Sequence, residues 1–347
     1  MPTSEPPIAV RRLAEAASGP LAALARLAGD ASTRVYFRAT TAAGATRIAA
    51  LHEQPFLPAS FPFLETTDLF AACGVRVPQV LAADGPNGVL LLEDLGDLTL
   101  HAWLSAAGSA ALPVADRLYR QAVDIIVRLQ ESGTPRLDAT THAGREALDA
   151  ARFRFELDYF ARHFIAGVRG IEATPAQTTA LEHAFDTFCA RLDAEPRVLC
   201  HRDFHSRNLM LPEGPDAPAA LAVIDHQDAR SGPDTYDLAS LLHDAYVDVP
   251  EDRVDAMLEY YRERRGVAEP AAALRRRFER MAVQRTLKAA GTFAAQKMLH
   301  GRDSYLPFLP RVLRLAAVGL ARDPELAPLH AALSPLVREI GAVPKED

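Results

Sequence analysis

The chain of 347 residues is long enough to bury a sizeable core in two lobes. It is 49% hydrophobic and 24% charged with a formal net charge of -7, which is ordinary for a globular protein and lacks the basic balance typical of a nucleic-acid reader. No stretch reaches the roughly 18 apolar residues that span a bilayer, the N-terminus has no apolar run of signal-peptide length, and the three cysteines form no CxxC pair. We therefore expect a cytoplasmic enzyme that needs no nucleic acid, membrane or obligate protein partner.

The first part of the chain has the pattern of a small, β-rich lobe. Dense alanine and leucine over 13–27 favour a helix that ends at Gly29-Asp30. Two β-prone runs, 35–39 and 46–51, flank an Ala-Gly turn and predict a hairpin, and a helix is expected over 61–73. The continuous apolar run 89–93 is typical of a buried strand.

After Gly96 the pattern becomes helical. Apolar residues at 114, 118, 122, 125 and 129 repeat with the period of a helix, and further helices are expected near 181–192, 238–245, 271–300 and 308–321. The chain is therefore predicted to be α+β and bilobal, with a nucleotide-covering lobe over 1–95, a catalytic and acceptor-binding lobe over 96–347, and a linker near Leu95 to Leu98.

The most informative segment is HRDFHSRN at 201–208, followed by an aspartate at 225 in the run LAVIDHQD. Short apolar runs at 198–200, 209–211 and 221–224 surround these residues and predict short buried strands. The polar cluster then lies on a loop between strands, and Asp225 lies at a strand end. Loops held by a rigid scaffold often carry catalytic groups.

This spacing of acid, amide and acid suits the transfer of a phosphoryl group from a nucleotide such as ATP. Mg²⁺ prefers oxygen ligands and usually takes one or two protein carboxylates, which fits Asn208 and Asp225 as its ligands. Asp203 is the candidate that orients the acceptor hydroxyl and accepts its proton late in the transfer. His201 is expected to brace the loop through hydrogen bonds to the backbone.

At these residues the chain resembles the catalytic loop HxDxxxxN of protein-kinase-like and aminoglycoside-phosphotransferase-like enzymes. Asp225 resembles their metal-binding aspartate, and GPDTYDLA at 232–239 resembles the helix start that follows their metal site. The resemblance implies ATP and Mg²⁺ as cofactors. It also implies that Asp237 caps this helix and holds the catalytic loop by hydrogen bonds.

Two further segments, DASTRVYFR at 30–38 and LLEDLGD at 91–97, narrow the resemblance to one branch. They are similar to the nucleotide-covering hairpin and the hinge strand of bacterial anomeric kinases that act on N-acetylmuramate and N-acetylglucosamine in peptidoglycan recycling. The resemblance implies that Ser32, Thr33 and Arg34 lie near the nucleotide. It also implies that Glu93 and Leu95 offer backbone groups to adenine, and that the products are sugar 1-phosphates.

The chain departs from the wider family at the third strand, where most members carry a phosphate-binding lysine. The strand TRIAAL at 46–51 contains no lysine, and Arg47, Arg34 and Arg38 are the alternatives for the missing cation. Glu65 is the nearest candidate for the helix glutamate that pairs with this cation. The metal-binding aspartate is followed by His226-Gln227 in place of Phe-Gly, so a switch of the DFG type is not expected.

Several alternatives remain open from the sequence. Ser32 and Thr33 either contact a phosphate or close a turn. Four basic residues either bind an acidic substituent of the acceptor or lie on solvated helix faces, namely Arg152, Arg154, Arg285 and Lys288. The run Arg275 to Arg277 is expected on a solvated helix face. A zinc site built from His201, His205 and His226 is disfavoured, because the HExxH pattern is absent.

The function has its own alternatives. The acceptor could instead be another small hydroxyl compound, such as an aminoglycoside, choline or a homoserine-like molecule, because the catalytic loop does not separate these. A pseudokinase that binds nucleotide without transferring phosphate is the rival of a different class, favoured by the missing lysine and opposed by the complete catalytic loop.

Overall fold

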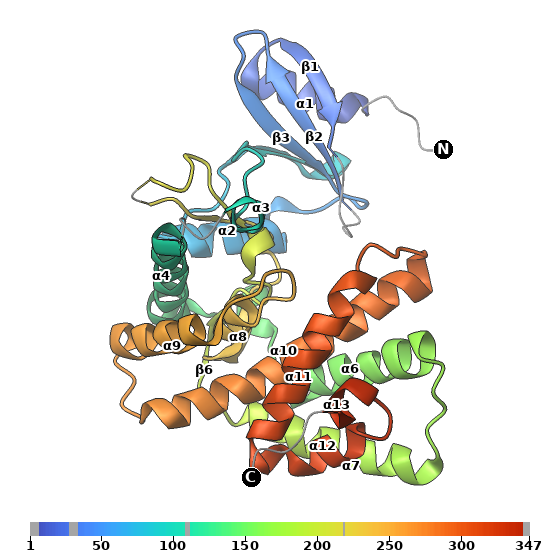
Figure 1. The fold of residues 1–347 in the computed structure, drawn as a ribbon. Coiled ribbons are helices and arrows are strands. Elements are labelled where there is room, and N and C mark those ends of the chain that lie inside the picture. Colours follow the sequence, from blue (N-terminus) through green and yellow to red (C-terminus); the bar gives the residue numbers. More distant parts are fainter. Residues whose placement is uncertain (1–6, 28–33, 108–111, 218, 343–347) are drawn as a thin grey trace.

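The computed structural model describes residues 7–27, 34–107, 112–217 and 219–342 (Figure 1). The N-terminal lobe is an antiparallel sheet with the strand order β1-β2-β3-β5-β4. Its strands are β1 (Leu21–Arg26), β2 (Val35–Thr41), β3 (Thr46–Leu51), β4 (Val80–Asp84) and β5 (Val89–Glu93). The helices α1 (Ile8–Ser18) and α2 (Pro62–Ala72) accompany it.

The strand β5 is buried on both faces, which explains its continuous apolar run. Val89 and Leu91 pack into the cluster that α1 covers, whereas Leu90 and Leu92 pack with Phe63 of α2 on the other face. Because successive side chains of a strand point to opposite faces, an unbroken apolar run is what two covered faces require. The predicted hairpin, the 61–73 helix and the buried strand are confirmed.

The prediction of one helix over 13–27 is wrong. The helix α1 ends at Ser18, Gly19 has a φ of 83°, Pro20 follows, and Leu21–Arg26 pairs with β2 as an edge strand. Glycine at the end of a helix followed by proline terminates it, and strand pairing then outweighs the helix propensity of alanine and leucine. Gly29 and Asp30, which were expected to end that helix, lie outside the described residues.

The C-terminal lobe is mostly helical. Its short strands pair as two antiparallel ribbons, β6 (Arg197–Cys200) with β9 (Arg230–Pro233) and β7 (Leu209–Met210) with β8 (Ala222–Val223). Its helices are α3 (Leu100–Ala106), α4 (Leu112–Arg128), α5 (His142–Arg145), α6 (Ala150–Phe160), α7 (Pro175–Asp193), α8 (Tyr236–Leu242), α9 (Glu251–Arg265), α10 (Ala271–His300), α11 (Leu309–Arg322), α12 (Ala327–Leu333) and α13 (Arg338–Gly341). A π-helical segment, Ala161–Val168, continues α6.

The helix α10 runs through the middle of this lobe and packs against α6, α8, α9 and α11 (Figure 1). Gly291 permits the close crossing with α6, because a Cβ atom there would lie 2.7 Å from Phe160 Cα. One large apolar cluster joins α4, α6, α7, α8, α10 and α11. The bilobal α+β fold predicted from the sequence is confirmed.

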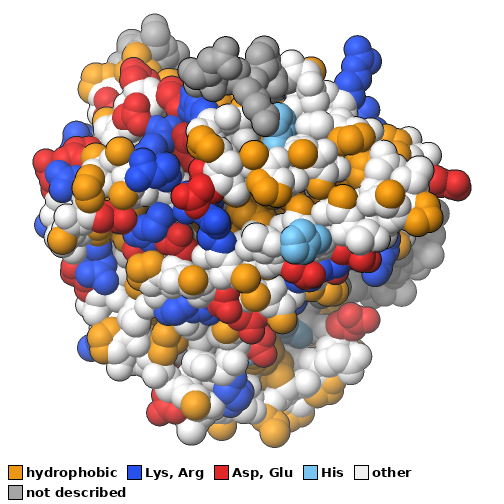
Figure 2. Space-filling view, turned by 90° about the horizontal axis from the view of Figure 1, so that it is seen from below, with side chains coloured by type: hydrophobic (Ala, Val, Ile, Leu, Met, Phe, Trp, Pro, Cys, Tyr) orange, Lys and Arg blue, Asp and Glu red, His pale blue; other side chains and the backbone are white. Residues whose placement is uncertain are grey.

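The surface carries both charges. On the face seen in Figure 2, Lys and Arg side chains are interspersed with Asp and Glu.

The run at 275–277 was expected on a solvated helix face. This prediction is wrong for Arg277, which is mostly buried and pairs with Glu195, Asp234 and Glu269. Of the helices in the described ranges, none combines the length and apolarity that crossing a bilayer requires.

Candidate active site

The first half of the catalytic loop is held by a buried carboxylate. Asp237, in the first turn of α8, accepts the backbone N–H of His201 at 2.7 Å and that of Arg202 at 3.0 Å. Burial raises the pKa of Asp237, and the two N–H donors and neighbouring cations oppose this. Thr235 is the residue that precedes the helix. The Asp237 carboxylate therefore faces the loop rather than capping its own helix.

The second half of the loop is held by Asp244, a residue that the sequence did not single out. Its carboxylate is fully buried and accepts the N–H of Ser206 at 2.8 Å and that of Tyr246 at 2.7 Å. Asp237 and Asp244 thus hold the loop from the start of α8 and from the segment just after it. The available signal was a single aspartate after the apolar run of α8, which is weak.

Inside the loop, His201 and Asn208 bond to the backbone. His201 Nδ1 accepts the N–H of Asp203 at 3.2 Å, so Nε2 carries the proton and donates to the Ile224 carbonyl at 3.0 Å. Asn208 Nδ2 donates to the Asp203 carbonyl at 2.9 Å. The backbone contacts of His201 are of the kind expected for a residue that braces the loop.

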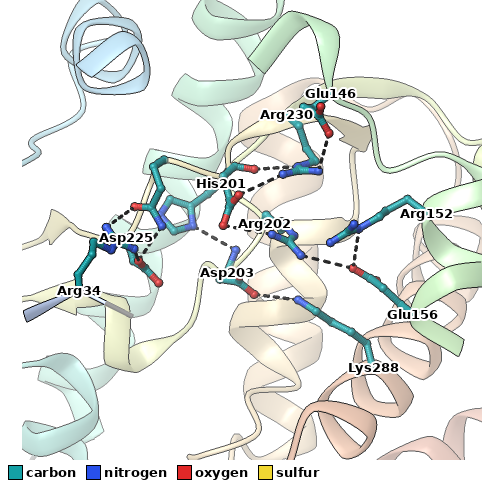
Figure 3. A network of polar contacts seen from close by, with 12 residues as sticks. Arg34, Glu146, Arg152, Glu156, His201, Arg202, Asp203, Asp225, Arg230 and Lys288 are labelled. Carbon is teal, nitrogen blue, oxygen red and sulfur yellow. Dashed lines mark hydrogen bonds and ion pairs between the residues drawn. The ribbon is translucent and has the colours of Figure 1, made fainter. Parts of the chain in front are cut away.

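The carboxylate of Asp203 is 28% exposed and faces two cations of α10, of which Figure 3 shows Lys288. Lys288 Nζ lies 3.0 Å from Asp203 Oδ1, and Arg285 Nη2 lies 3.4 Å from the same oxygen. Burial alone raises the pKa of Asp203, but Lys288, Arg285 and Arg202 outweigh burial and hold this pKa well below its usual range. Asp203 is therefore ionised at neutral pH.

Asp225 follows β8 and is held more loosely, with a side chain that is 44% exposed. Its Oδ1 accepts from Arg34 Nη2 at 3.1 Å and from Gln227 Nε2 at 2.9 Å. Among the described residues, Arg202 and Asp225 are the two non-glycine residues with positive φ, at 86° and 62°. Such backbone strain concentrates at functional sites.

Asn208 and Asp225 line one cleft between the lobes, with a volume of ≈ 340 Å³. The Asn208 amide nitrogen donates to the Asp203 carbonyl, so its amide oxygen is the atom left for a cation. An amide oxygen and a partly exposed carboxylate are the donors that Mg²⁺ prefers. The residues present thus fit the ion.

The same cleft contains the residues expected to meet adenine. Glu93 and Leu95 both line it, beside the apolar side chains of Ile48, Leu92, Met210 and Ile224. The Glu93 N–H donates to the Gln79 carbonyl at 2.8 Å, and the Glu93 side chain turns to Arg76 and the Gln79 N–H. The carbonyl of Glu93 and the backbone of Leu95 are then the groups that can meet a base.

The three candidates for the missing cation lie in different surroundings. Arg34 contacts Asp225, whereas Arg38 is held by Asp94 at 2.7 Å and by Asp97 at 2.8 Å. Arg47 donates to its neighbouring Thr46 carbonyl and is not among the residues that line the cleft. Arg34 is thus the best placed of the three. Ser32 and Thr33 lie outside the described residues.

The contacts also bear on the remaining candidates from the sequence. Glu65 accepts the backbone N–H of His142 at 2.9 Å, and no ion pair joins it to a cation of the sheet among the residues that the structure describes. His226 is fully buried and bonds to Thr67 Oγ1 at 2.7 Å, and burial lowers the pKa of His226 to about 3. In the part of the chain that the structure describes, no group of three His, Cys, Asp or Glu side chains is arranged to hold a metal.

The four basic residues considered for an acidic substituent separate clearly. Arg154 pairs with Asp158 and Asp186, away from the loop. Arg152 contacts Glu156, which in turn pairs with Arg202, so Arg152 does not reach Asp203 directly (Figure 3). Arg285 and Lys288 do not lie on a solvated helix face, because their side chains are mostly buried against Asp203. Their spacing of three residues on α10 puts them on one side of the helix.

A small sheet over a helical lobe, with an Asp-Asn loop and a second aspartate at the cleft between them, defines a kinase-like phosphotransferase. The family model described as "Phosphotransferase enzyme family" matches residues 23–277, and the chain belongs to this family.

Curated relatives agree with this assignment, and a solved structure shares the fold. The chain is 37% identical to an N-acetylmuramate/N-acetylglucosamine kinase of Neisseria meningitidis, with 89% of each chain covered. It is 34% identical to the protein of that name from Pseudomonas aeruginosa, with 91% of this chain and 89% of the relative covered. A choline/ethanolamine kinase family protein from Mesorhizobium loti shares the fold at a TM-score of 0.60 and 17% identity, covering 94% of this chain and 97% of its own.

Proposed function

We propose that the protein is an ATP- and Mg²⁺-dependent kinase that phosphorylates the anomeric hydroxyl of N-acetylmuramate, N-acetylglucosamine or both. The observation that carries the proposal is the placement of three oxygen-bearing side chains around one loop. Asn208 and Asp225 line the interlobe cleft, and Asp203 lines a separate pocket beside α10. The curated relatives at 32–37% identity are named N-acetylmuramate/N-acetylglucosamine kinases, which supports these two sugars as acceptors.

In this proposal the interlobe cleft takes the nucleotide. The backbone of Glu93 and Leu95 meets adenine, and Arg34 reaches the phosphates from the N-terminal lobe, together with Ser32 and Thr33. Asn208 and Asp225 hold Mg²⁺, which supplies positive charge to the phosphate oxygens when bound.

Asp203 orients the acceptor hydroxyl. Because its pKa lies well below the usual range, it is a weak base in the ground state. It therefore accepts the proton late, as the hydroxyl oxygen forms its bond to the γ-phosphorus of ATP and becomes more acidic. The bond from that phosphorus to the bridging oxygen breaks in the same transfer, and ADP leaves with its electron pair. His201, Asp237 and Asp244 keep the loop in the geometry that this step needs.

We also propose that the lobes divide at 1–95 and 96–347, that the protein works in the cytoplasm, and that its sugar 1-phosphates serve peptidoglycan recycling. Limited proteolysis near the linker and cell fractionation test the first two. Loss of growth on recovered cell-wall sugars after deletion of the gene tests the third.

The direct test is ³¹P NMR of the purified protein with ATP, Mg²⁺ and each of several sugars. An anomeric phosphate ester should form with N-acetylmuramate or N-acetylglucosamine, and it should not form with the Asp203→Ala or Asp225→Ala variants. Phosphorylation of an aminoglycoside or choline in place of these sugars would contradict the proposed acceptor. Nucleotide binding with no transfer to any acceptor would favour a pseudokinase.

A further inference from the structure

The pocket beside α10 is separate from the cleft that is proposed to take the nucleotide. It has a volume of ≈ 90 Å³, and Asp203, Arg285 and Lys288 line it together with Tyr246 and Phe293. None of these five is among the residues that line the cleft of Asn208 and Asp225. A ligand in this pocket would therefore meet Asp203 without crossing the nucleotide site.

Two buried cations of this pocket share one carboxylate. The side chain of Arg285 is 9% exposed and that of Lys288 is 14% exposed, and both lie against Oδ1 of Asp203. A buried charge that is incompletely paired is costly, so two cations on one carboxylate leave a place for a second anion.

The neighbouring carboxylates are engaged elsewhere. Glu146 and Asp228 pair with Arg230, as Figure 3 shows for Glu146, and Asp237 and Asp244 accept backbone N–H groups of the loop. Among the described residues, none of these four carboxylates forms an ion pair with Arg285 or Lys288, so Asp203 is the direct anionic partner that the two cations share.

The donors of the two α10 cations are incompletely used by the residues that the structure describes. Arg285 Nη1 donates to the Tyr236 hydroxyl at 2.7 Å, but its Nε is buried and donates to no described acceptor. Lys288 has three N–H donors, and its hydrogen-bond partner among the described residues is Asp203. Buried polar groups are nearly always hydrogen-bonded, so these donors are available to a ligand.

The choice of lysine at position 288 is itself informative. Of the 38 basic residues, only Lys288, Lys297 and Lys345 are lysines, so the chain uses arginine for almost every cation. An ammonium group is compact and can contact Asp203 and a second anion at once, whereas a guanidinium presents a planar fork. Burial and the nearby Arg285 lower the pKa of Lys288 to about 8, and it stays largely protonated at neutral pH.

We propose that Arg285 and Lys288 form an anion-binding subsite on the acceptor side of Asp203, for a carboxylate or a phosphate group. The proposal rests on the sugar-kinase function proposed above. The anion has two possible sources, the carboxylate of an acceptor such as N-acetylmuramate or the phosphate of the sugar 1-phosphate product. In either case the two cations offset the repulsion between Asp203 and the incoming anion.

Calorimetric titration with three sugars separates the two sources. N-acetylglucosamine is neutral, N-acetylmuramate adds a carboxylate, and N-acetylglucosamine 1-phosphate adds a phosphate. The variant is Lys288→Met, and the matched control is Lys297→Met on the same helix, where Lys297 is 42% exposed and pairs with Asp303. Loss of one charge-assisted contact is expected to weaken binding of the anionic probe about 10- to 100-fold.

A selective loss for N-acetylmuramate supports the carboxylate, and a selective loss for the sugar phosphate supports the phosphate. An equal change for all three sugars, or no change, overturns the subsite. Lys288→Arg should retain part of the anion affinity because the charge is kept. If Lys288→Met does not fold, Lys288→Gln, which is also uncharged, replaces it in the same titrations.

A thermal-shift titration with inorganic phosphate keeps the test independent of the sugar. If wild-type protein binds none of the three sugars, the proposed acceptor is wrong, and phosphate then decides the subsite alone. Phosphate should raise the Tm of the wild type and of Lys297→Met, but not that of Lys288→Met. Equal shifts in all three proteins, or none, would overturn the subsite.

Discussion

On the side of the 201–208 loop that is proposed to face the acceptor, Asp203 contacts cations of α10, a helix that belongs to the same large core as the loop itself. On the nucleotide side, Asp225 contacts Arg34 across the cleft from the N-terminal lobe, whose sheet is held by two smaller clusters. Contacts within one core keep their geometry, whereas contacts across a cleft depend on how the lobes are arranged. In the proposed function, the groups that meet the acceptor are thus pre-positioned within one core, and the groups that meet the nucleotide come together from the two lobes.

The largest expected effect is on the acceptor side. Asp203→Asn removes the charge and the proton acceptor, and kcat should fall about 10²- to 10⁴-fold. Nucleotide affinity should stay close to that of the wild type, because Asn208 and Asp225 line a different pocket. A coupled ADP-release assay and a nucleotide titration measure the two quantities. A kcat within a few-fold of wild type would remove Asp203 from the proposed chemistry.

The next effect tests whether the C-terminal core fixes the loop. Asp237→Ala leaves two buried N–H groups without an acceptor and should lower the free energy of unfolding by about 3 kcal/mol, measured by urea denaturation. Asp237→Asn keeps one acceptor and should lose less. Asp248→Ala, at an exposed aspartate that pairs with Arg311, is the control and should lose under about 1 kcal/mol. Equal losses at the two positions would show that the loop is not held in this way.

The pocket beside α10 should also contribute a pH dependence to stability. Burial lowers the pKa of His243 from 6.5 to about 4, so the folded state keeps this imidazole neutral while the unfolded state binds a proton. The contribution of His243 to the free energy of unfolding is then fully present above pH 6.5. It decreases by about 1.4 kcal/mol for each pH unit as the pH falls from 6.5 to 4.

In His243→Gln the free energy of unfolding should fall less steeply over this range than in the wild type, by that slope. Urea denaturation at several pH values measures it. Parallel pH profiles for the two proteins would mean that His243 is not buried in its neutral form.

The smallest effect is expected on the nucleotide side. Arg34→Ala should raise the KM for ATP about tenfold through loss of one charge-assisted contact, with the KM for the acceptor unchanged. Arg47→Ala, in the same sheet but bonded to the Thr46 carbonyl, is the control and should leave both values near wild type. Steady-state kinetics with each substrate varied in turn give both values. A rise in the acceptor KM alone would break the division between the two sides.

The sequence predicted the elements that have a strong local signal. The continuous apolar run of β5, the hairpin β2-β3 and the long helix α10 were expected at nearly their observed bounds. The prediction of a helix for the segment before the hairpin was wrong. Alanine and leucine occur in helices and in strands, and only the pairing with β2 makes Leu21–Arg26 a strand. Local composition does not contain that pairing.

The sequence by itself determined the catalytic loop, since Asp203, Asn208 and the following Asp225 are fixed by short-range spacing between short strands. Only the tertiary structure decided what surrounds them. Lys288 and Arg285 lie more than eighty residues from Asp203 on a helix buried on most sides, where no periodicity marks the site-facing residues. Arg34 reaches Asp225 from 191 residues away. Such contacts depend on helix packing and lobe placement, which are properties of the whole chain rather than of any segment.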